Sequence, residues 1–252
     1  MSRLIVVSNR VSVPKARGAA GSQGGLAVAL GSALRERRGI WFGWSGNETK
    51  KFSGHLDMQK NHGVTTATID LEPQDVDEYY NGYANRTLWP LFHYRIDLAE
   101  YESGFGKGYE RVNQRFADSL GPLIDPEDVV WVHDYQLFML GMYLRQAGWR
   151  GKLGYFLHVP FPASDIFSIL PWAAEILESL VSYDLIGVHT VRTRADAKRR
   201  FADKDTKLEY IEPPGRMAPT YDSLVKKVAD YGYDISKLRK VPQQPLDQRD
   251  DG

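Results

Sequence analysis

The sequence predicts an α/β fold, in which a Rossmann-like parallel sheet carries helices on both faces. Two observations lead to this prediction. Short apolar runs rich in β-branched residues recur along the chain, and segments with the helical spacing of apolar residues separate them. Strands that are apolar along their whole length are typical of parallel sheets that are covered on both sides. We therefore expect residues 1–202 to form one domain of this kind.

Six runs of the sequence are expected to be strands, and the segments between them helices. The strands are expected at residues 3–7, 40–44, 64–69, 129–132, 153–157 and 184–188. The first helix is expected over 24–38, where Leu26, Leu30 and Leu34 lie four residues apart and form one apolar stripe. Pro73 is expected to open the second, because the first turn of a helix does not need its N–H. The remaining helices are expected near 107–120, 135–147, 164–170 and 173–181 and from 192 onward.

The alternating pattern weakens after residue 202. The segment 203–252 contains one plausible helix, near 220–231, and at most one short strand. Its final residues, VPQQPLDQRDDG, are rich in proline, glutamine and aspartate, a composition typical of disorder. We therefore expect a short irregular tail with one helix and a disordered end.

The composition excludes several classes of function. Of the 252 residues, 32 are basic and 32 acidic, whereas a general nucleic-acid-binding protein normally has a basic surplus. Cysteine is absent, which excludes disulfides, thiolate nucleophiles and cysteine zinc sites. No apolar run approaches the roughly 18 residues of a membrane span, and the N-terminus MSRLIVVSNR lacks the h-region of a signal peptide. We expect a cytoplasmic protein with no nucleic-acid and no membrane partner.

Polar residues follow several predicted strands at the point where each strand ends. Arg10 follows the first, His133 and Asp134 the fourth, His158 the fifth and His189 the sixth. In open α/β sheets, ligands bind beyond the carboxyl ends of the strands. Each residue taken alone is more typical of a cap or a structural contact, but together they favour a ligand site. Metal binding is compatible with these residue types, but no ligand spacing supports it, and we expect none.

The glycine pair Gly24-Gly25 precedes the first predicted helix. Glycine lets a backbone approach a phosphate closely, and a helix N-terminus offers unpaired N–H groups to an anion. Arg10 strengthens this interpretation, because arginine binds phosphate through two parallel hydrogen bonds. A flexible turn is the alternative, since neither a GxGxxG nor a P-loop spacing is present.

The stretch YYNGYANRTLWPLFHYR, residues 79–95, is dense in aromatic and basic residues. Core packing with a few charged side chains reaching the surface would explain most of them. Aromatic rings beside polar groups also form sugar-binding walls, because a pyranose has an apolar face and a polar rim. Both interpretations stay open on the residues alone.

Several stretches, taken in order, jointly resemble one family. They are VVSNR, GGLAVAL, WFGWSG, DEYYNGYANRTLWPLFHYR, VWVHDYQL, GYFLHVPFP and DLIGVHT. From residue 3 to about 200, the chain is similar to the N-terminal half of the trehalose-6-phosphate synthases, glycosyltransferase family 20. The resemblance implies one half of a GT-B fold, in which two Rossmann-like domains face each other across the active site. It also implies transfer of glucose from UDP-glucose to glucose 6-phosphate with retention, with no metal and no other cofactor.

The resemblance also assigns roles to individual residues. Arg10 would bind the phosphate of glucose 6-phosphate, and Tyr80 and Trp89 would line the pocket for this acceptor. Gly25 would approach the diphosphate of the donor.

Asp134 and His158 would be the catalytic residues, Asp134 in contact with the reacting sugars and His158 with the donor glucose. In the implied mechanism the acceptor attacks from the face that the leaving group departs from, and the departing phosphate helps to deprotonate the attacking hydroxyl. Positioning and electrostatics would supply most of the rate.

Two features depart from the family pattern. Gln136 stands where the family motif HDYHL commonly has its second histidine. No segment after residue 202 is long enough to be the donor-binding half, so we expect a truncated chain that is weak or inactive alone and whose exposed face favours a homo-oligomer. Two other functions stay open, a non-catalytic sugar-phosphate-binding module and a sister transferase with another phosphorylated acceptor.

Overall fold

The computed structural model describes residues 2–11, 34–35, 37–61, 64–188 and 208–210. Within these residues the chain forms an eight-stranded sheet in the order β3-β4-β2-β1-β5-β6-β7-β8. The strands are β1 (Leu4–Arg10), β2 (Ile40–Glu48), β3 (Asp57–Asn61), β4 (Val64–Leu71), β5 (Val129–His133), β6 (Lys152–Leu157), β7 (Leu185–Val188) and β8 (Leu208–Tyr210). All neighbours pair in parallel except β3 and β4, which form an antiparallel pair at one edge.

The six strands expected from the sequence are β1, β2, β4, β5, β6 and β7, so this prediction is confirmed. Strand β3 is an addition, because its sequence DMQKN has no apolar alternation and its pairing with β4 is what makes it a strand. Strand β8 pairs with β7 and brings three residues of the expected tail into the sheet. The division of the chain at residue 202 stays a prediction.

The helical segments follow the expected order. They are α2 (Pro73–Asp75), the π-helix η1 (Val76–Leu88), α3 (Trp89–Phe92), η2 (Ile96–Leu98), α4 (Ser103–Leu120), η3 (Gly121–Leu123), η4 (Tyr135–Leu137), α5 (Leu140–Gln146), α6 (Ser164–Phe167) and α7 (Ala173–Leu180). The helix expected over 135–147 is divided into the 3₁₀ turn η4 and the helix α5. Of the helix expected over 24–38, the structure describes Leu34 and Arg35, which are helical, and Arg37 and Arg38, which form a turn. The helices expected from 192 onward and over 220–231 lie outside the described residues, as does the end of the tail.

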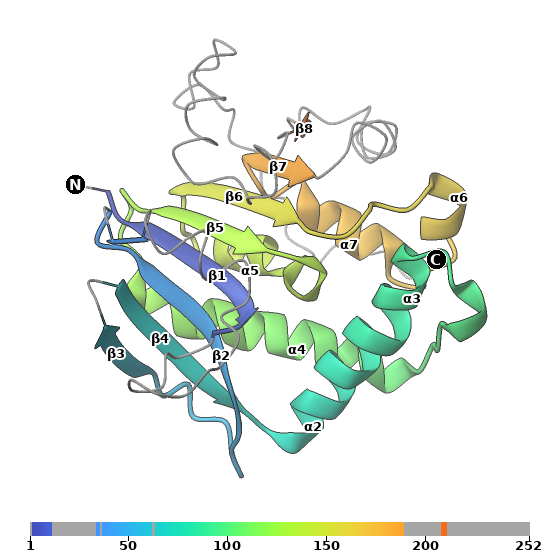
Figure 1. The fold of residues 1–252 in the computed structure, drawn as a ribbon, viewed down its shortest axis with the longest axis horizontal. Helices are drawn as coiled ribbons and strands as arrows, with labels where there is room; N and C mark the ends of the chain where they lie inside the picture. The colour runs from blue at the N-terminus through green and yellow to red at the C-terminus, as the bar shows by residue number, and fades with distance from the viewer. Residues whose placement is uncertain (1, 12–33, 36, 62–63, 189–207, 211–252) are drawn as a thin grey trace.

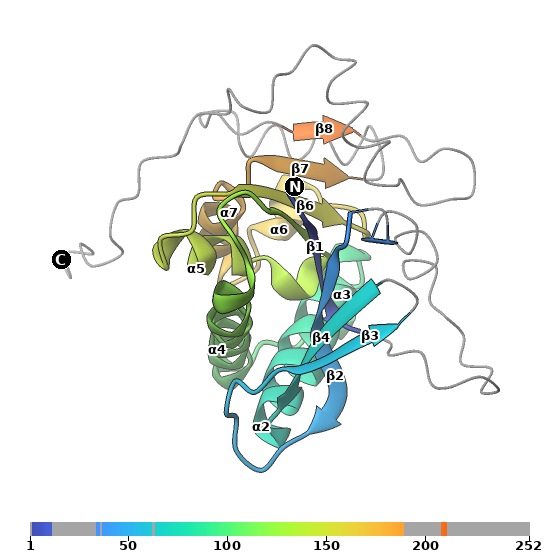
Figure 2. The same ribbon diagram turned by 90° about the vertical axis from the view of Figure 1, so that its left-hand side faces the viewer.

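The sheet is buried on both faces. Leu4, Ile5, Val6 and Val7 are each at most 1% exposed, although neighbours in a strand point to opposite sides. Helices α4, α5 and α7 lie on one face (Figures 1 and 2), where Ile5 and Val7 join the larger apolar core. Leu4 and Val6 belong to a second cluster on the opposite face, together with Trp41, Trp131 and Phe156. This double burial explains why the strands are continuously apolar in sequence.

The π-helix η1 packs closely against α4. The N–H of Trp89 bonds to the carbonyl of Ala84, five residues earlier, which is the π-helical pattern. At the contact, a Cβ on Gly82 would lie 2.5 Å from the ring of Phe105, so only glycine fits there. Such π-helical stretches are frequent at functional sites, and this one carries Tyr79, Tyr80 and the chain that leads to Trp89.

A buried carboxylate fixes the start of this helical segment against α4. Asp75 is 0% exposed. It accepts a hydrogen bond from Nε of Arg111 at 2.8 Å and another from Nη1 of Arg115. Arg111 also donates to Glu78 at 2.8 Å, and Arg115 donates to Glu72 at 3.0 Å. Every charge in the cluster therefore has an opposite partner, which a buried carboxylate requires.

We expect Asp75→Asn to lower the free energy of unfolding by about 3 kcal/mol, because it leaves two arginines partly buried without their shared carboxylate. Urea denaturation measures this change. The matched control is Asp77→Asn in the same segment: Asp77 is 69% exposed and 3.6 Å from Arg86, and its loss should change stability by less than about 0.5 kcal/mol. Equal effects for the two variants would contradict the assignment of Asp75 as the anchor.

Candidate active site at the carboxyl ends of the strands

The site lies where the strand order reverses. The chain runs from β1 to β2 and β4 on one side, and then continues on the other side of β1 with β5, β6 and β7. Strands β1 and β5 pair in parallel from Leu4 opposite Val129 to Val7 opposite Val132, so both carboxyl ends reach the same edge of the sheet. Ligands of open α/β sheets bind in the crevice at this reversal point.

Asp134, directly after β5, has a backbone conformation that is nearly restricted to glycine. Its φ is 75° and its ψ is 167°, a region that costs a non-glycine residue about 1–3 kcal/mol. Three hydrogen bonds hold it there. Its N–H donates to the carbonyl of Phe156 at 2.8 Å, and its Oδ1 accepts from the N–H groups of Tyr135 at 3.0 Å and His158 at 3.3 Å. Backbone strain of this kind is concentrated at functional sites.

The protonation of Asp134 is shifted toward neutrality. Burial raises the pKa of its carboxyl to about 6, although the two backbone hydrogen bonds and the nearby His93 act in the opposite direction. Near pH 6 the group therefore exchanges between an acceptor-only carboxylate and a carboxylic acid that can also donate. A carboxyl group poised in this way is suited to contact a sugar hydroxyl or a developing charge.

We expect Asp134→Asn to stabilise the chain at pH 8. An acid whose folded pKa is raised contributes stability that is complete at low pH and is lost as the pH rises through that pKa of about 6. The uncharged asparagine does not titrate and keeps an Oδ1 acceptor. Its advantage should reach about 1–3 kcal/mol at pH 8 and shrink toward zero near pH 4, as measured by urea denaturation across pH. A difference that stays constant with pH would contradict the shifted carboxyl.

His133 and His158 form a stacked pair beside Asp134. Nδ1 of His133 lies 2.9 Å from Nε2 of His158, with ring centroids 5.2 Å apart and planes 27° apart. His133 is only 2% exposed and packs on Trp131. Burial lowers the pKa of His133 well below its usual value, and a charge on His158 would lower it further. The His133 ring is therefore neutral at physiological pH.

Arg10 is an exposed cation that lies on an aromatic surface. It ends β1 opposite Trp44 of β2, and its guanidinium carbon lies 5.5 Å from the centroid of that indole. Gly46, with φ at +90°, lets the guanidinium pack there, because a Cβ would come within 2.3 Å of Nη2. The rings of Tyr80 and Trp44 pack edge to face, with centroids 5.7 Å apart. These residues form a wall with one cation at its end, suited to a phosphorylated sugar.

Two further contacts connect η1 and α3 to this edge. The hydroxyl of Tyr79 donates to Oδ1 of Asn9 at 2.8 Å, which couples η1 to the end of β1. Trp89 is 45% exposed and lies 6.0 Å from the ring of Tyr135. His93 stacks on Trp89 at 3.7 Å and donates from Nδ1 to its carbonyl at 2.7 Å, since a carbonyl oxygen only accepts.

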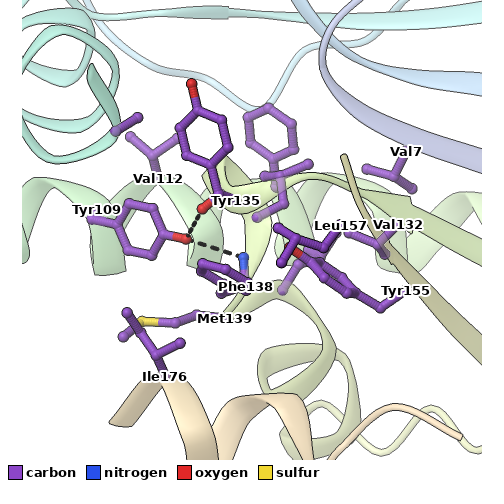
Figure 3. Packing of buried hydrophobic residues seen from close by; sticks show 14 of the residues in the cluster. Val7, Tyr109, Val112, Val132, Tyr135, Phe138, Met139, Tyr155, Leu157 and Ile176 are labelled. Atoms are coloured by element: carbon purple, nitrogen blue, oxygen red, sulfur yellow. Dashed lines mark hydrogen bonds between the residues drawn. The ribbon is translucent and has the colours of Figure 1, made fainter. Parts of the chain in front are cut away.

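The turn that follows Asp134 is fixed from beneath by a buried tyrosine (Figure 3). The Tyr109 hydroxyl donates to the carbonyl of Tyr135 at 2.6 Å and accepts from the N–H of Phe138 at 3.0 Å. Asn113 adds a hydrogen bond from its Nδ2 to the carbonyl of Gln136 at 3.1 Å. Helix α4 therefore holds η4, and with it the strained backbone of Asp134, in a single position.

The structure places Arg10, Tyr80, Trp89, Asp134 and His158 on the elements that meet at this edge, whereas their functional roles stay predictions. Gly24, Gly25 and His189 lie outside the described residues. Four further residues lie in the same region and were not predicted from the strand ends: Trp44, His93, Tyr135 and Asn85, whose Oδ1 is 3.5 Å from the Tyr135 hydroxyl. His93 and Asn85 follow no strand, but both belong to the aromatic stretch 79–95, whose density was the available signal.

Within the part of the chain that the structure describes, no group of three or more histidine, aspartate and glutamate side chains is arranged to hold a metal ion. Over the same residues, none of the helices combines the length and apolar character needed to cross a membrane.

The parallel sheet and its flanking helices define the class of protein: the chain forms one Rossmann-like half of a GT-B glycosyltransferase. The model of glycosyltransferase family 20 matches residues 2–208, and the chain belongs to that family, a family of nucleotide-sugar glycosyltransferases. This confirms the resemblance seen in the sequence.

Three similar proteins carry names of trehalose-phosphate synthases. The trehalose-6-phosphate synthase of Sinorhizobium fredii is 50% identical over 192 residues, which cover 75% of this chain and 41% of that protein. The crystal structure of an alpha,alpha-trehalose-phosphate synthase (UDP-forming) from Burkholderia vietnamiensis matches with a TM-score of 0.80 and 35% identity, over 92% of this chain and 52% of that one. Another, from Burkholderia xenovorans in complex with glucose 6-phosphate, matches with a TM-score of 0.74 and 34% identity, over 92% and 53%. The chain thus spans about two fifths to one half of the length of these relatives.

Proposed function

We propose that this chain binds glucose 6-phosphate and forms the acceptor half of an alpha,alpha-trehalose-phosphate synthase (UDP-forming). The observation that carries the proposal is the exposed guanidinium of Arg10 on Trp44, with Tyr80 completing the aromatic wall. A cation at one end of an aromatic wall suits a ligand with a phosphate at one end and a pyranose at the other. The naming of the relatives and the glucose 6-phosphate complex of one of them support this choice of ligand.

In the proposed site, Arg10 binds the phosphate through charge-assisted hydrogen bonds, and Tyr80 and Trp89 line the sugar pocket. Gly25 approaches the donor diphosphate. Asp134 and His158 stand at the centre, where the acceptor and the glucose of UDP-glucose meet.

The reaction is a group transfer with retention. The acceptor hydroxyl attacks the anomeric carbon of the donor glucose, a new glycosidic bond forms, and the bond to the diphosphate breaks. The proton of the hydroxyl leaves with the departing diphosphate, which gives UDP and the phosphorylated disaccharide. The protein contributes by orienting the two sugars and by presenting dipoles to the developing charge. No metal or other cofactor is needed in this proposal, a cytoplasmic location is expected, and a homo-oligomer stays a prediction.

We expect Arg10→Ala to weaken glucose 6-phosphate binding by about 1.5–3 kcal/mol, or roughly 10- to 150-fold in Kd, because a charged hydrogen-bond donor is lost. Isothermal titration calorimetry on the 252-residue chain measures this. The matched control is Arg150→Ala, since Arg150 is exposed at the opposite, amino end of β6. Unchanged affinity for Arg10→Ala, or an equal loss in both variants, would show that the phosphate binds elsewhere.

Turnover separates the enzyme from a non-catalytic sugar-phosphate-binding module. For the 252 residues alone we expect turnover far below about one per second, because catalysis requires both substrates in one closed, water-excluding cleft. The assay follows UDP release and the disaccharide phosphate from UDP-glucose and glucose 6-phosphate, with a full-length family member as positive control. Turnover near one per second would contradict this expectation and would favour a complete site, within the chain or between two copies.

A further inference from the structure

We propose that His133 is a positioning residue that sets the tautomer of His158: Nδ1–H of His133 donates to Nε2 of His158, so His158 carries its own proton on Nδ1. The inference rests on the proposed function for its meaning in catalysis, but its structural content can be tested without any substrate. The motivating contact is the 2.9 Å separation of the two nitrogens.

Only two neutral arrangements satisfy this contact. In one, His133 donates from Nδ1 and its Nε2 is a bare lone pair. In the other, His133 accepts at Nδ1 and its proton lies on Nε2. Nε2 of His133 is buried and has no hydrogen-bond partner among the described residues. Buried N–H groups without a partner are rarer in native structures than under-satisfied acceptors, which favours the first arrangement.

The residues around His133 leave its ring little freedom to change orientation. Its ring packs against the indole of Trp131, 4.5 Å away between centroids, and against the ring of Phe156 at 6.3 Å. Main-chain pairing holds His133 opposite Phe156 in the β5–β6 ladder, and the N–H of His158 is held by Oδ1 of Asp134. Both rings are therefore fixed at their base, and the proton position on one determines that on the other.

As a consequence, His158 and Asp134 have different hydrogen-bonding roles at the site. His158 becomes a neutral hydrogen-bond donor at Nδ1, whereas the Asp134 carboxylate is an acceptor. A sugar hydroxyl donates one hydrogen bond and accepts others, so a neighbouring donor and acceptor suit it. In the opposite tautomer both residues would present acceptors, and a hydroxyl could satisfy only one of them.

The experiment reads the tautomers directly. The 252-residue chain is labelled with ¹⁵N-histidine, and two-bond ¹H–¹⁵N correlation spectra at pH 7.5 distinguish Nδ1–H from Nε2–H rings. Signals are assigned from His133 and His158 variants. We expect both rings in the Nδ1–H form. A His158 signal of the Nε2–H form in the wild-type chain would overturn the proposal.

Two variants of equal shape test causation. His133→Asn places an amide NH₂ near the former Nδ1 and should keep His158 in the Nδ1–H form. His133→Leu has the same branching without a donor and should shift His158 to a mixture of tautomers. Circular dichroism verifies the fold of each. A His158 spectrum unchanged in His133→Leu would overturn the proposal. If the wild-type chain has the expected tautomers but does not bind glucose 6-phosphate, that result would count against the proposed function and not against the tautomer assignment.

Discussion

The strained backbone of Asp134 is the constraint on which the rest of the site depends. With φ at 75°, the chain turns from β5 into η4, and the carboxylate stays at the carboxyl edge of the sheet, bonded to the N–H of Tyr135. Its Oδ1 connects the N–H of Tyr135 to that of His158 and so joins the ends of β5 and β6. The cost of about 1–3 kcal/mol is offset by these bonds and by the Tyr109 contacts beneath the turn. Strain held by so many bonds fixes a single geometry.

Ion pairs fix the helical segment that carries Tyr80 on the other side of the site. The Asp75 cluster fastens the start of the helical segment to α4, and the same helix α4 holds η4 through Tyr109. One rigid helix therefore sets the distance between the segment that carries Tyr80 and the turn that follows Asp134. A site that binds a small ligand with few contacts depends on such preorganisation, since every side chain that must be ordered on binding reduces the affinity.

The sequence predicted most of the fold because the sheet is buried on both faces, and burial leaves a continuous apolar run for each parallel strand. It missed β3, whose polar residues form a strand only through pairing with β4. It also missed the π-helical register of η1, which is defined by backbone hydrogen bonds such as that from the N–H of Trp89 to the carbonyl of Ala84. Strand-end reasoning pointed to His133, Asp134 and His158. It could not find Trp44 or His93, because their place in the site depends on their nearness to Arg10 and Asp134, respectively, which are distant in sequence.

The site separates its charge from its neutral polar groups. Arg10 is an exposed cation, so its interaction with an anion is strong but weakened by salt. His133 is buried and neutral, whereas Asp134, with a pKa of about 6, becomes a carboxylate as the pH rises above that value, so the centre of the site never carries the positive charge of the Arg10 end. A phosphate is therefore attracted to the Arg10 end, while the sugar meets uncharged donors and an adjustable carboxyl. This arrangement would orient a sugar phosphate before its hydroxyls make any contact, because charge attraction acts on the phosphate at long range, whereas hydrogen bonds to the sugar form only at contact.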